Sequence, residues 1–65
     1  MMDEIMQVPG KIWHYLNSHG ESTIYQIKKE IKLPDSLIYM GIGWLAKEDK
    51  INIRRDGGSI KVSLK

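Results

Sequence analysis

The side chains of this chain that are best suited to bind another molecule are basic. Two pairs of adjacent basic residues are the first candidates. Lys28 and Lys29 are adjacent within an isoleucine-rich stretch, and Arg54 and Arg55 are adjacent just before an Asp-Gly-Gly-Ser sequence. Mobile cations of this kind suit phosphate oxygens, because such contacts need positive charge more than a fixed geometry. A lysine pair is also common on the solvated face of a helix, so that alternative stays open for Lys28 and Lys29.

The other reactive side chains form neither a catalytic nor a metal-binding pattern. The chain has no cysteine, which excludes disulfides, thiolate ligands and thiol nucleophiles. His14 and His19 would point to different faces of a helix, and no acid lies at ligand spacing from them. Ser22 and Ser59 fall in predicted turns, without a general base beside them. We therefore expect no enzyme activity, no metal ion, no cofactor and no small-molecule ligand.

The length of 65 residues predicts a single domain over residues 1–65. Ten Lys and Arg against eight Asp and Glu give a formal net charge of +2, which permits a nucleic acid or an acidic partner without requiring either. No apolar run is long enough to cross a bilayer. The start of the chain, MMDEIMQVPG, carries acids where a secretion signal would carry lysines. We therefore expect a cytoplasmic protein without membrane contact.

Three helical patterns precede the arginine pair and must position the cations. The first is an apolar stripe at the helical period, made of Ile5, Val8, Ile12 and Leu16. It predicts a helix over about residues 4–18. Proline is most comfortable in a first turn, so a helix that starts only at Pro9 is the alternative.

A second helix is predicted to begin after Thr23 and to end near Lys32. Thr23 and Gln26 form a T-x-x-Q capping box, in which each side chain satisfies an open backbone donor of the first turn. Pro34 cannot continue this helix, and Asp35 or its neighbour is expected to cap the next one. The short connection is typical of a helix-turn-helix. The inward residues are expected to be Ile24, Ile27 and Ile31.

The third helix has a broad apolar face and a narrower exposed one. At about 100° per residue, the inward positions are Leu37, Ile38, Gly41, Ile42, Trp44 and Leu45. The outward positions are Ser36, Tyr39, Gly43 and Lys47, with Met40 and Ala46 beside them. Gly41 would let another helix approach closely, whereas Gly43 has no evident packing role. Trp44 lies at the edge of the inward face and, like Trp13, is expected chiefly in the core.

Two alternating segments follow and predict a β-hairpin. Their apolar positions are Ile51 and Ile53 in the first segment and Ile60, Val62 and Leu64 in the second. We expect these five residues to close the base of the helical core. The DGGS sequence at residues 56–59 separates them and is strong hairpin chemistry, because glycine accepts the positive φ angles that such turns need. Three helices followed by a hairpin predict a mostly helical α+β fold, the winged helix-turn-helix, with the hairpin as its wing.

Three stretches along the chain form a characteristic series: GKIWHYLN, YQIKKEIKL and IYMGIGWLAKEDKI. In this order they resemble a small family of uncharacterised bacterial and archaeal winged helix-turn-helix proteins of about this length. The resemblance covers residues 10–65, and its most specific strings are GKIW at residues 10–13 and GWLAKEDKI at residues 43–51. It implies a DNA-binding role without enzyme activity or cofactor, and homodimers would be unsurprising. The chain departs from the family pattern at Pro9, where a helix former is expected.

The third helix is therefore the expected recognition helix of a protein that binds double-stranded DNA and regulates transcription. Ser36, Tyr39 and Lys47 would lie in the groove, while the phosphates would be met by Lys28, Lys29, Arg54 and Arg55. The outward positions lack the arginine, asparagine and glutamine that read base edges with two hydrogen bonds. We therefore expect binding mainly through phosphates.

A protein-interaction module or homodimer without nucleic-acid binding is the alternative. Its surface would be the third-helix residues Tyr39, Met40, Gly43 and Trp44. Tyrosine, methionine and tryptophan are enriched at protein interfaces, which favours this alternative. A solvated helix face without any partner is also compatible with these residue types.

Overall fold

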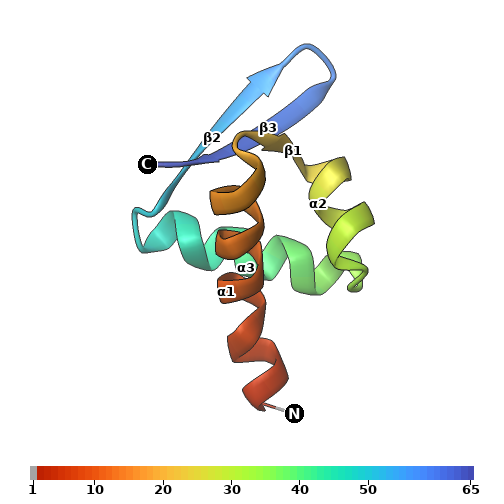
Figure 1. Cartoon of the computed structure of the whole chain (residues 1–65), viewed down its shortest axis with the longest axis vertical. Coiled ribbons are helices and arrows are strands. Elements are labelled where there is room, and N and C mark those ends of the chain that lie inside the picture. The colour runs from red at the N-terminus through yellow and green to blue at the C-terminus, as the bar shows by residue number, and fades with distance from the viewer. Residues whose placement is uncertain (1) are drawn as a thin grey trace.

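Three helices and a C-terminal hairpin follow one another in the computed structural model, in the order that the sequence predicts (Figure 1). The structure describes the backbone of residues 2–65 and the side chains of residues 7–65. Its elements are α1 (Met2–His19), β1 (Ser22–Thr23), α2 (Ile24–Ile31), α3 (Asp35–Lys47), β2 (Ile51–Asp56) and β3 (Ser59–Leu64). The fold is a winged helix-turn-helix, so the predicted fold class is confirmed.

The first helix continues through Pro9, which decides between the two predicted starts. Val8, Ile12 and Leu16 are buried as the apolar stripe predicts, while Ile5 lies outside the side chains that the structure describes. The helix α3 crosses α1 at this level. A Cβ atom on Gly41 would lie only 2.7 Å from Ile12 Cδ1 and 2.8 Å from Val8 Cγ1. Glycine at position 41 therefore lets the two helices pack closely, as expected.

The helix α2 is capped at both of its ends, and its connection to α3 is short. The backbone N–H of Gln26 donates to Thr23 Oγ1 over 3.1 Å, and the backbone N–H of Thr23 donates to Gln26 Oε1 over 2.9 Å. These two hydrogen bonds confirm the capping box. Lys32 ends α2 in the left-handed conformation, with φ of 59°. The N-cap of α3 is Pro34, whose side chain makes no capping hydrogen bond, and Asp35 is the first helical residue. The cap therefore falls on the neighbour of Asp35.

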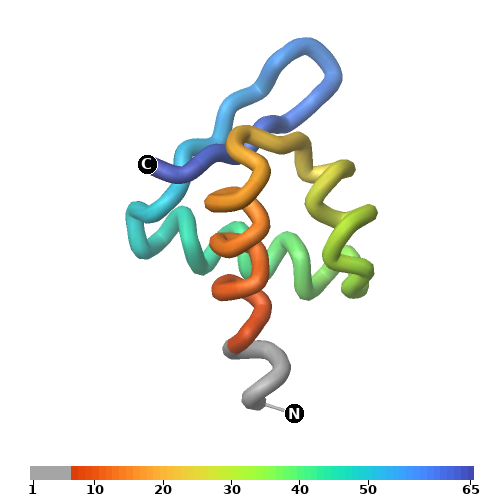
Figure 2. Tube along the Cα trace, viewed as in Figure 1, coloured from red at the N-terminus to blue at the C-terminus, as the bar shows by residue number. Residues whose placement is uncertain are grey.

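A third strand, which the sequence did not reveal, ties the wing to the helices. The sheet is antiparallel with the order β1-β3-β2, and Ser22 pairs with Val62. Ser22 is buried and its hydroxyl donates to the Gly20 carbonyl over 3.0 Å. Figure 2 shows β3 passing the corner between α1 and α2, where this pairing occurs. A strand of only two residues is too short to display an alternating pattern.

One hydrophobic core joins all three helices to the base of the wing. Its buried members are Val8, Ile12, Leu16, Ile24, Ile27, Ile38, Ile42, Leu45, Ile51 and Val62. Ile53 and Ile60 share the apolar face of the hairpin but remain 50% and 36% exposed. The outer part of the hairpin extends beyond the helices (Figure 1), which agrees with the partial exposure of these two residues. The expectation that both complete the core was therefore wrong.

Trp44 also differs from its expected place in the core. Its side chain is 45% exposed, whereas Trp13 is half-buried against the core cluster. The α1–α3 contact is centred on Gly41, so Trp44 lies at the flank of that contact rather than beneath it.

Within residues 2–65, no helix has the combination of length and apolar content that spanning a membrane demands.

Candidate nucleic-acid interface

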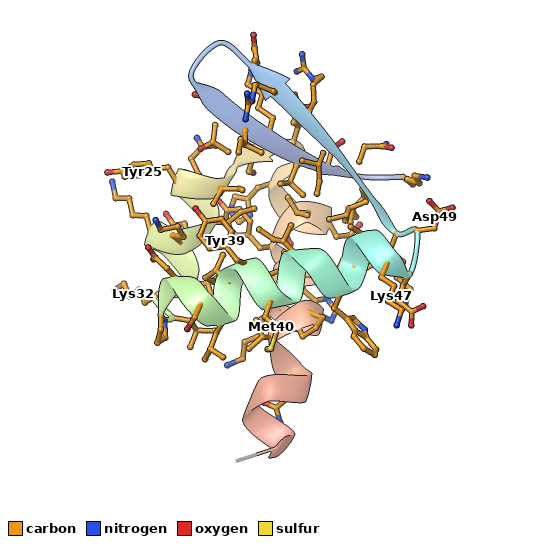
Figure 3. The ribbon with its side chains drawn as sticks, turned by 180° about the vertical axis from the view of Figure 1, so that it is seen from behind. Tyr25, Lys32, Tyr39, Met40, Lys47 and Asp49 are labelled. Atoms are coloured by element: carbon orange, nitrogen blue, oxygen red, sulfur yellow. The ribbon has the colours of Figure 1, made fainter. Side chains whose placement is uncertain are left out.

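The outer face of α3, defined by Ser36, Tyr39, Met40, Gly43 and Lys47, is exposed along its whole length. Figure 3 shows α3 in front of the helices, with the wing above it and α2 at its N-terminal end. Tyr39 points toward the wing, and Met40 lies on the opposite edge of α3, below the helix in this view. Lys47 lies at the C-terminal end (Figure 3). The predicted groove residues Ser36, Tyr39 and Lys47 therefore share one open helix face.

Lys28 links α2 to the start of α3 instead of extending into solvent. Its Nζ atom donates to Asp35 Oδ2 over 3.0 Å and lies 6.0 Å from the centre of the Tyr39 ring. The hydrogen bond to Asp35, together with the attraction between the two charges, raises the pKa of Lys28. Lys28 thus remains a cation at neutral pH, but Asp35 offsets part of its field at the edge of the outer face.

The two arginines of the wing lie on opposite faces of the hairpin. Arg55 is paired across the strands with Ile60, and Arg54 is paired with Lys61. Residues directly opposite each other in an antiparallel pair point to the same face of the sheet, and neighbours along a strand point to opposite faces. Ile60 is on the apolar face, so Arg55 is on that face and Arg54 is on the other.

Acidic residues balance the cations on the Arg54 face of the wing. Arg54 donates to Glu21 Oε1 over 2.9 Å, which raises the pKa of the guanidinium. Lys61 lies 3.0 Å from Asp56 and lowers the pKa of that carboxyl, mainly through its hydrogen bond. Two acids therefore meet two bases on this face, and it offers little net charge to a phosphate. Successive side chains of a strand point to alternate faces, and this alternation was the sequence signal that Arg54 and Arg55 lie on opposite faces.

Three further cations are exposed without an acid bound to them. Among the side chains of residues 7–65, no acid forms an ion pair with Lys29, Lys47 or Arg55. Lys47 lies 5.9 Å from the centre of the Trp44 ring, within the range of a cation–π contact. Lys47 lies on the outer face of α3 itself, and Arg55 is opposite Ile60 on the apolar face of the wing. Lys29 lies on α2 and lines a separate hollow with Tyr15 of α1 and Tyr25.

A hollow of about 400 Å³ lies where α2, α3 and the tip of the wing meet. We call it the tyrosine hollow; it is lined by Thr23, Ile24, Tyr25, Lys28, Tyr39, Gly58, Ser59 and Ile60. Tyr25 is 70% exposed and Tyr39 is 52% exposed. Tyr25 and Ile60 were not among the predicted site residues. An outward tyrosine beside the capping box was the signal available for Tyr25, whereas the place of Ile60 depends on how far the wing reaches.

The residues predicted for a protein interface are divided between two edges of α3. Met40 and Trp44 are four positions apart on the edge away from the wing, and both are over two-fifths exposed. Trp44 also lines an open hollow of about 710 Å³ with Pro9, Gly10 and Trp13 of α1. Tyr39 lies on the other edge (Figure 3), and Gly43 faces open space between the two edges.

Comparisons with known proteins agree with this architecture. A family model described as a winged helix-turn-helix domain (DUF2582) matches residues 2–64. The uncharacterized protein MJ1608 of Methanocaldococcus jannaschii is 37% identical over 68 aligned residues, which cover 100% of this chain and 96% of that protein.

Two solved structures share the fold. One is the Zalpha domain from Carassius auratus PKZ in complex with Z-DNA, with a TM-score of 0.81 and 22% identity over 95% of this chain and 98% of that one. The other is the solution structure of protein BT2368 from Bacteroides thetaiotaomicron. Its TM-score is 0.83, with 31% identity over 98% of this chain and 79% of that one. At 22% identity, the Zalpha likeness shows the fold alone.

Proposed function

This chain belongs to the winged helix-turn-helix family described as DUF2582, and we propose that it binds double-stranded DNA with α3 as its recognition helix. The observation that carries the proposal is the open outer face of α3, which has Lys28 of α2 beside its first turn and Lys47 at its C-terminal end (Figure 3). The solved Zalpha domain, which has this fold and is bound to Z-DNA, supports DNA as the class of partner.

We place the phosphate contacts on Lys28, Lys29, Lys47 and Arg55. No acid among the described side chains forms an ion pair with Lys29, Lys47 or Arg55, and all three are exposed. The side chain of Lys28 extends from α2 toward Tyr39. Arg54 is left out of this set because it binds Glu21 on the other face of the wing. Ser36 and Tyr39 would enter the groove.

Binding of this kind depends strongly on salt and weakly on sequence. The outer face of α3 has no arginine, asparagine or glutamine, so it lacks the side chains that discriminate bases with paired hydrogen bonds. With roughly four phosphate contacts, log K is expected to fall with log salt at a slope of about −3.6. Our proposal further places the domain in the cytoplasm as a DNA-binding regulator of transcription without enzymatic activity.

Fluorescence anisotropy with a short labelled duplex of arbitrary sequence tests the proposal. Titrations at several salt concentrations give the slope directly. A slope between about −3 and −4, and similar affinities for unrelated duplexes, would support it. No binding at tens of micromolar protein in low salt, or binding that ignores salt, would overturn it.

A homodimer through the Met40 and Trp44 edge is the second candidate. The exposure of these two large apolar side chains, next to the hollow shared with Trp13, favours it. Sedimentation equilibrium of the wild type and of Trp44→Glu tests this candidate, with Tyr39→Glu as the variant on the other edge. Self-association that only Trp44→Glu removes would support this dimer, and a concentration-independent monomer would exclude it.

A further inference from the structure

Apart from Lys28, the side chains that line the tyrosine hollow are not among the proposed phosphate contacts. Two exposed tyrosine rings from different helices, Ile60 from the wing and the Lys28 ammonium line it together. We infer that this hollow binds an unstacked nucleobase, supplied either by a nucleotide extruded from a duplex or by a single strand. The inference rests on the proposed function and names the form of nucleic acid that the site prefers.

Exposed aromatic rings are the main argument for a base. Tyr39 keeps 52% of its surface exposed although it lies between α2 and the wing, and Tyr25 keeps 70%. Such rings stack on the π-face that every nucleobase has, and stacking of this kind tolerates any sequence. This tolerance fits an α3 face that has no side chains for paired hydrogen bonds to base edges. The volume of about 400 Å³ is in the range of sites for small planar ligands.

The ammonium group of Lys28 supplies positive charge for the phosphate of a bound nucleotide. Its Nζ atom lies 6.0 Å from the centre of the Tyr39 ring and is held there by Asp35. A base stacked on Tyr39 brings its own phosphate near that ammonium. Arg55 is paired across the strands with Ile60, one of the lining residues, and adds positive charge nearby. The hollow therefore combines a stacking surface with cations, as single-strand binding sites do.

A fully paired duplex keeps its bases stacked inside, so it has no base face to offer to Tyr39. Extrusion of a base costs least where the base is mismatched or unpaired. The hollow opens beside the outer face of α3, so a duplex docked on α3 would present an extruded nucleotide to Tyr39 (Figure 3). This arrangement predicts that a duplex with one extra base binds more tightly than the same duplex without it.

Three probes that carry 2-aminopurine, whose fluorescence is quenched by stacking, test the inference. They are a fully paired duplex, the same duplex with the 2-aminopurine nucleotide as a one-base bulge, and the single strand. We expect the bulged duplex to bind at least fivefold more tightly than the paired one, with a change in fluorescence on binding. Preferential binding of the single strand would also support the inference and would identify the single strand as the source of the base.

Variants separate stacking from general charge. Tyr39→Ala should cost the bulged probe about 5- to 150-fold more affinity than it costs the paired duplex, whose groove Tyr39 also enters. Tyr39→Phe keeps the ring and should bind like the wild type, and Met40→Ala on the other edge of α3 is the matched control. Far-UV circular dichroism establishes that each variant is folded.

The outcomes distinguish this inference from the proposed function. Equal affinity for paired and bulged duplexes, unchanged by Tyr39→Ala, would overturn the base site and leave duplex binding in place. Absence of binding to all three probes would overturn both. An effect of Met40→Ala as large as that of Tyr39→Ala would also contradict a site that depends on Tyr39.

Discussion

Lys28 of α2 and Asp35, the first residue of α3, form an ion pair with 3.0 Å between Nζ and Oδ2. The pair joins the two helices of the helix-turn-helix and holds Lys28 near the Tyr39 ring. A carboxylate at the start of a helix is also favoured by the helix dipole. The same carboxylate competes with any phosphate that approaches Lys28.

Asp35→Asn should therefore strengthen DNA binding. The substitution removes a negative charge beside the outer face of α3 and releases Lys28 for a phosphate. We expect the affinity to rise at each salt concentration while the slope stays near about −3.6, because Lys28 is already one of the four proposed phosphate contacts. Anisotropy titrations at several salt concentrations measure this slope. Weaker binding after Asp35→Asn would show that the pair positions Lys28 for DNA rather than competing with it.

The wing arginines offer a matched pair of substitutions. Arg55 lies on the apolar face of the wing, and no acid among the described side chains pairs with it, so it is free to contact a phosphate. Arg55→Ala should therefore weaken binding to all duplexes alike and make the salt slope shallower by about 0.9. Arg54→Ala should leave the slope unchanged, since Arg54 binds Glu21 on the other face. Equal losses in the two variants would contradict the division between the two faces.

The two glycines of α3 should respond oppositely to alanine. Gly41→Ala places a Cβ atom 2.7 Å from Ile12 Cδ1 and 2.8 Å from Val8 Cγ1, so we expect the free energy of unfolding to fall by about 1–2 kcal/mol. Gly43 faces open space, and Gly43→Ala should raise it by up to about 1 kcal/mol through helix propensity. Urea unfolding followed by circular dichroism measures both. A stabilising Gly41→Ala would mean that α1 and α3 separate at little cost.

The Asp56–Lys61 pair predicts a small dependence of stability on pH at acid values. Lys61 lowers the pKa of Asp56 below its ordinary value of about 3.8, so the unfolded chain binds more protons than the folded one in this range. The contribution is present above pH 3.8 and is lost as the pH falls through the lowered pKa. Urea unfolding from pH 6 to pH 2 should show wild type and Asp56→Asn converging at the acid end. A constant difference over this range would contradict it.

Local chemistry made much of the fold predictable from the sequence. The capping box of Thr23 and Gln26, the DGGS turn and the apolar stripe through Val8 and Leu16 all form as expected, because each depends on residues close together in the chain. The spacing of Gly41 within the inward face likewise predicted a close helix crossing.

Only part of the candidate site could be predicted from local sequence patterns. The sequence placed Ser36, Tyr39 and Lys47 on one helix face, and the structure keeps them there. It did not reveal that Asp35 binds Lys28, because that pair crosses from one helix to the next. Nor did it reveal that Arg54 binds Glu21, a residue 33 positions away.

By itself, then, the chain determined its helices, its turn and which side of each element is apolar, since periodicity is a property of neighbouring residues. Only the tertiary structure decided how far that apolar side is covered. Ile51 is buried while Ile53, two residues on along β2, is half exposed, and the outer part of the hairpin extends beyond the helices (Figure 1). The tyrosine hollow exists for the same reason: the reach of the hairpin past α2 and α3 brings Ile60 beside Tyr39.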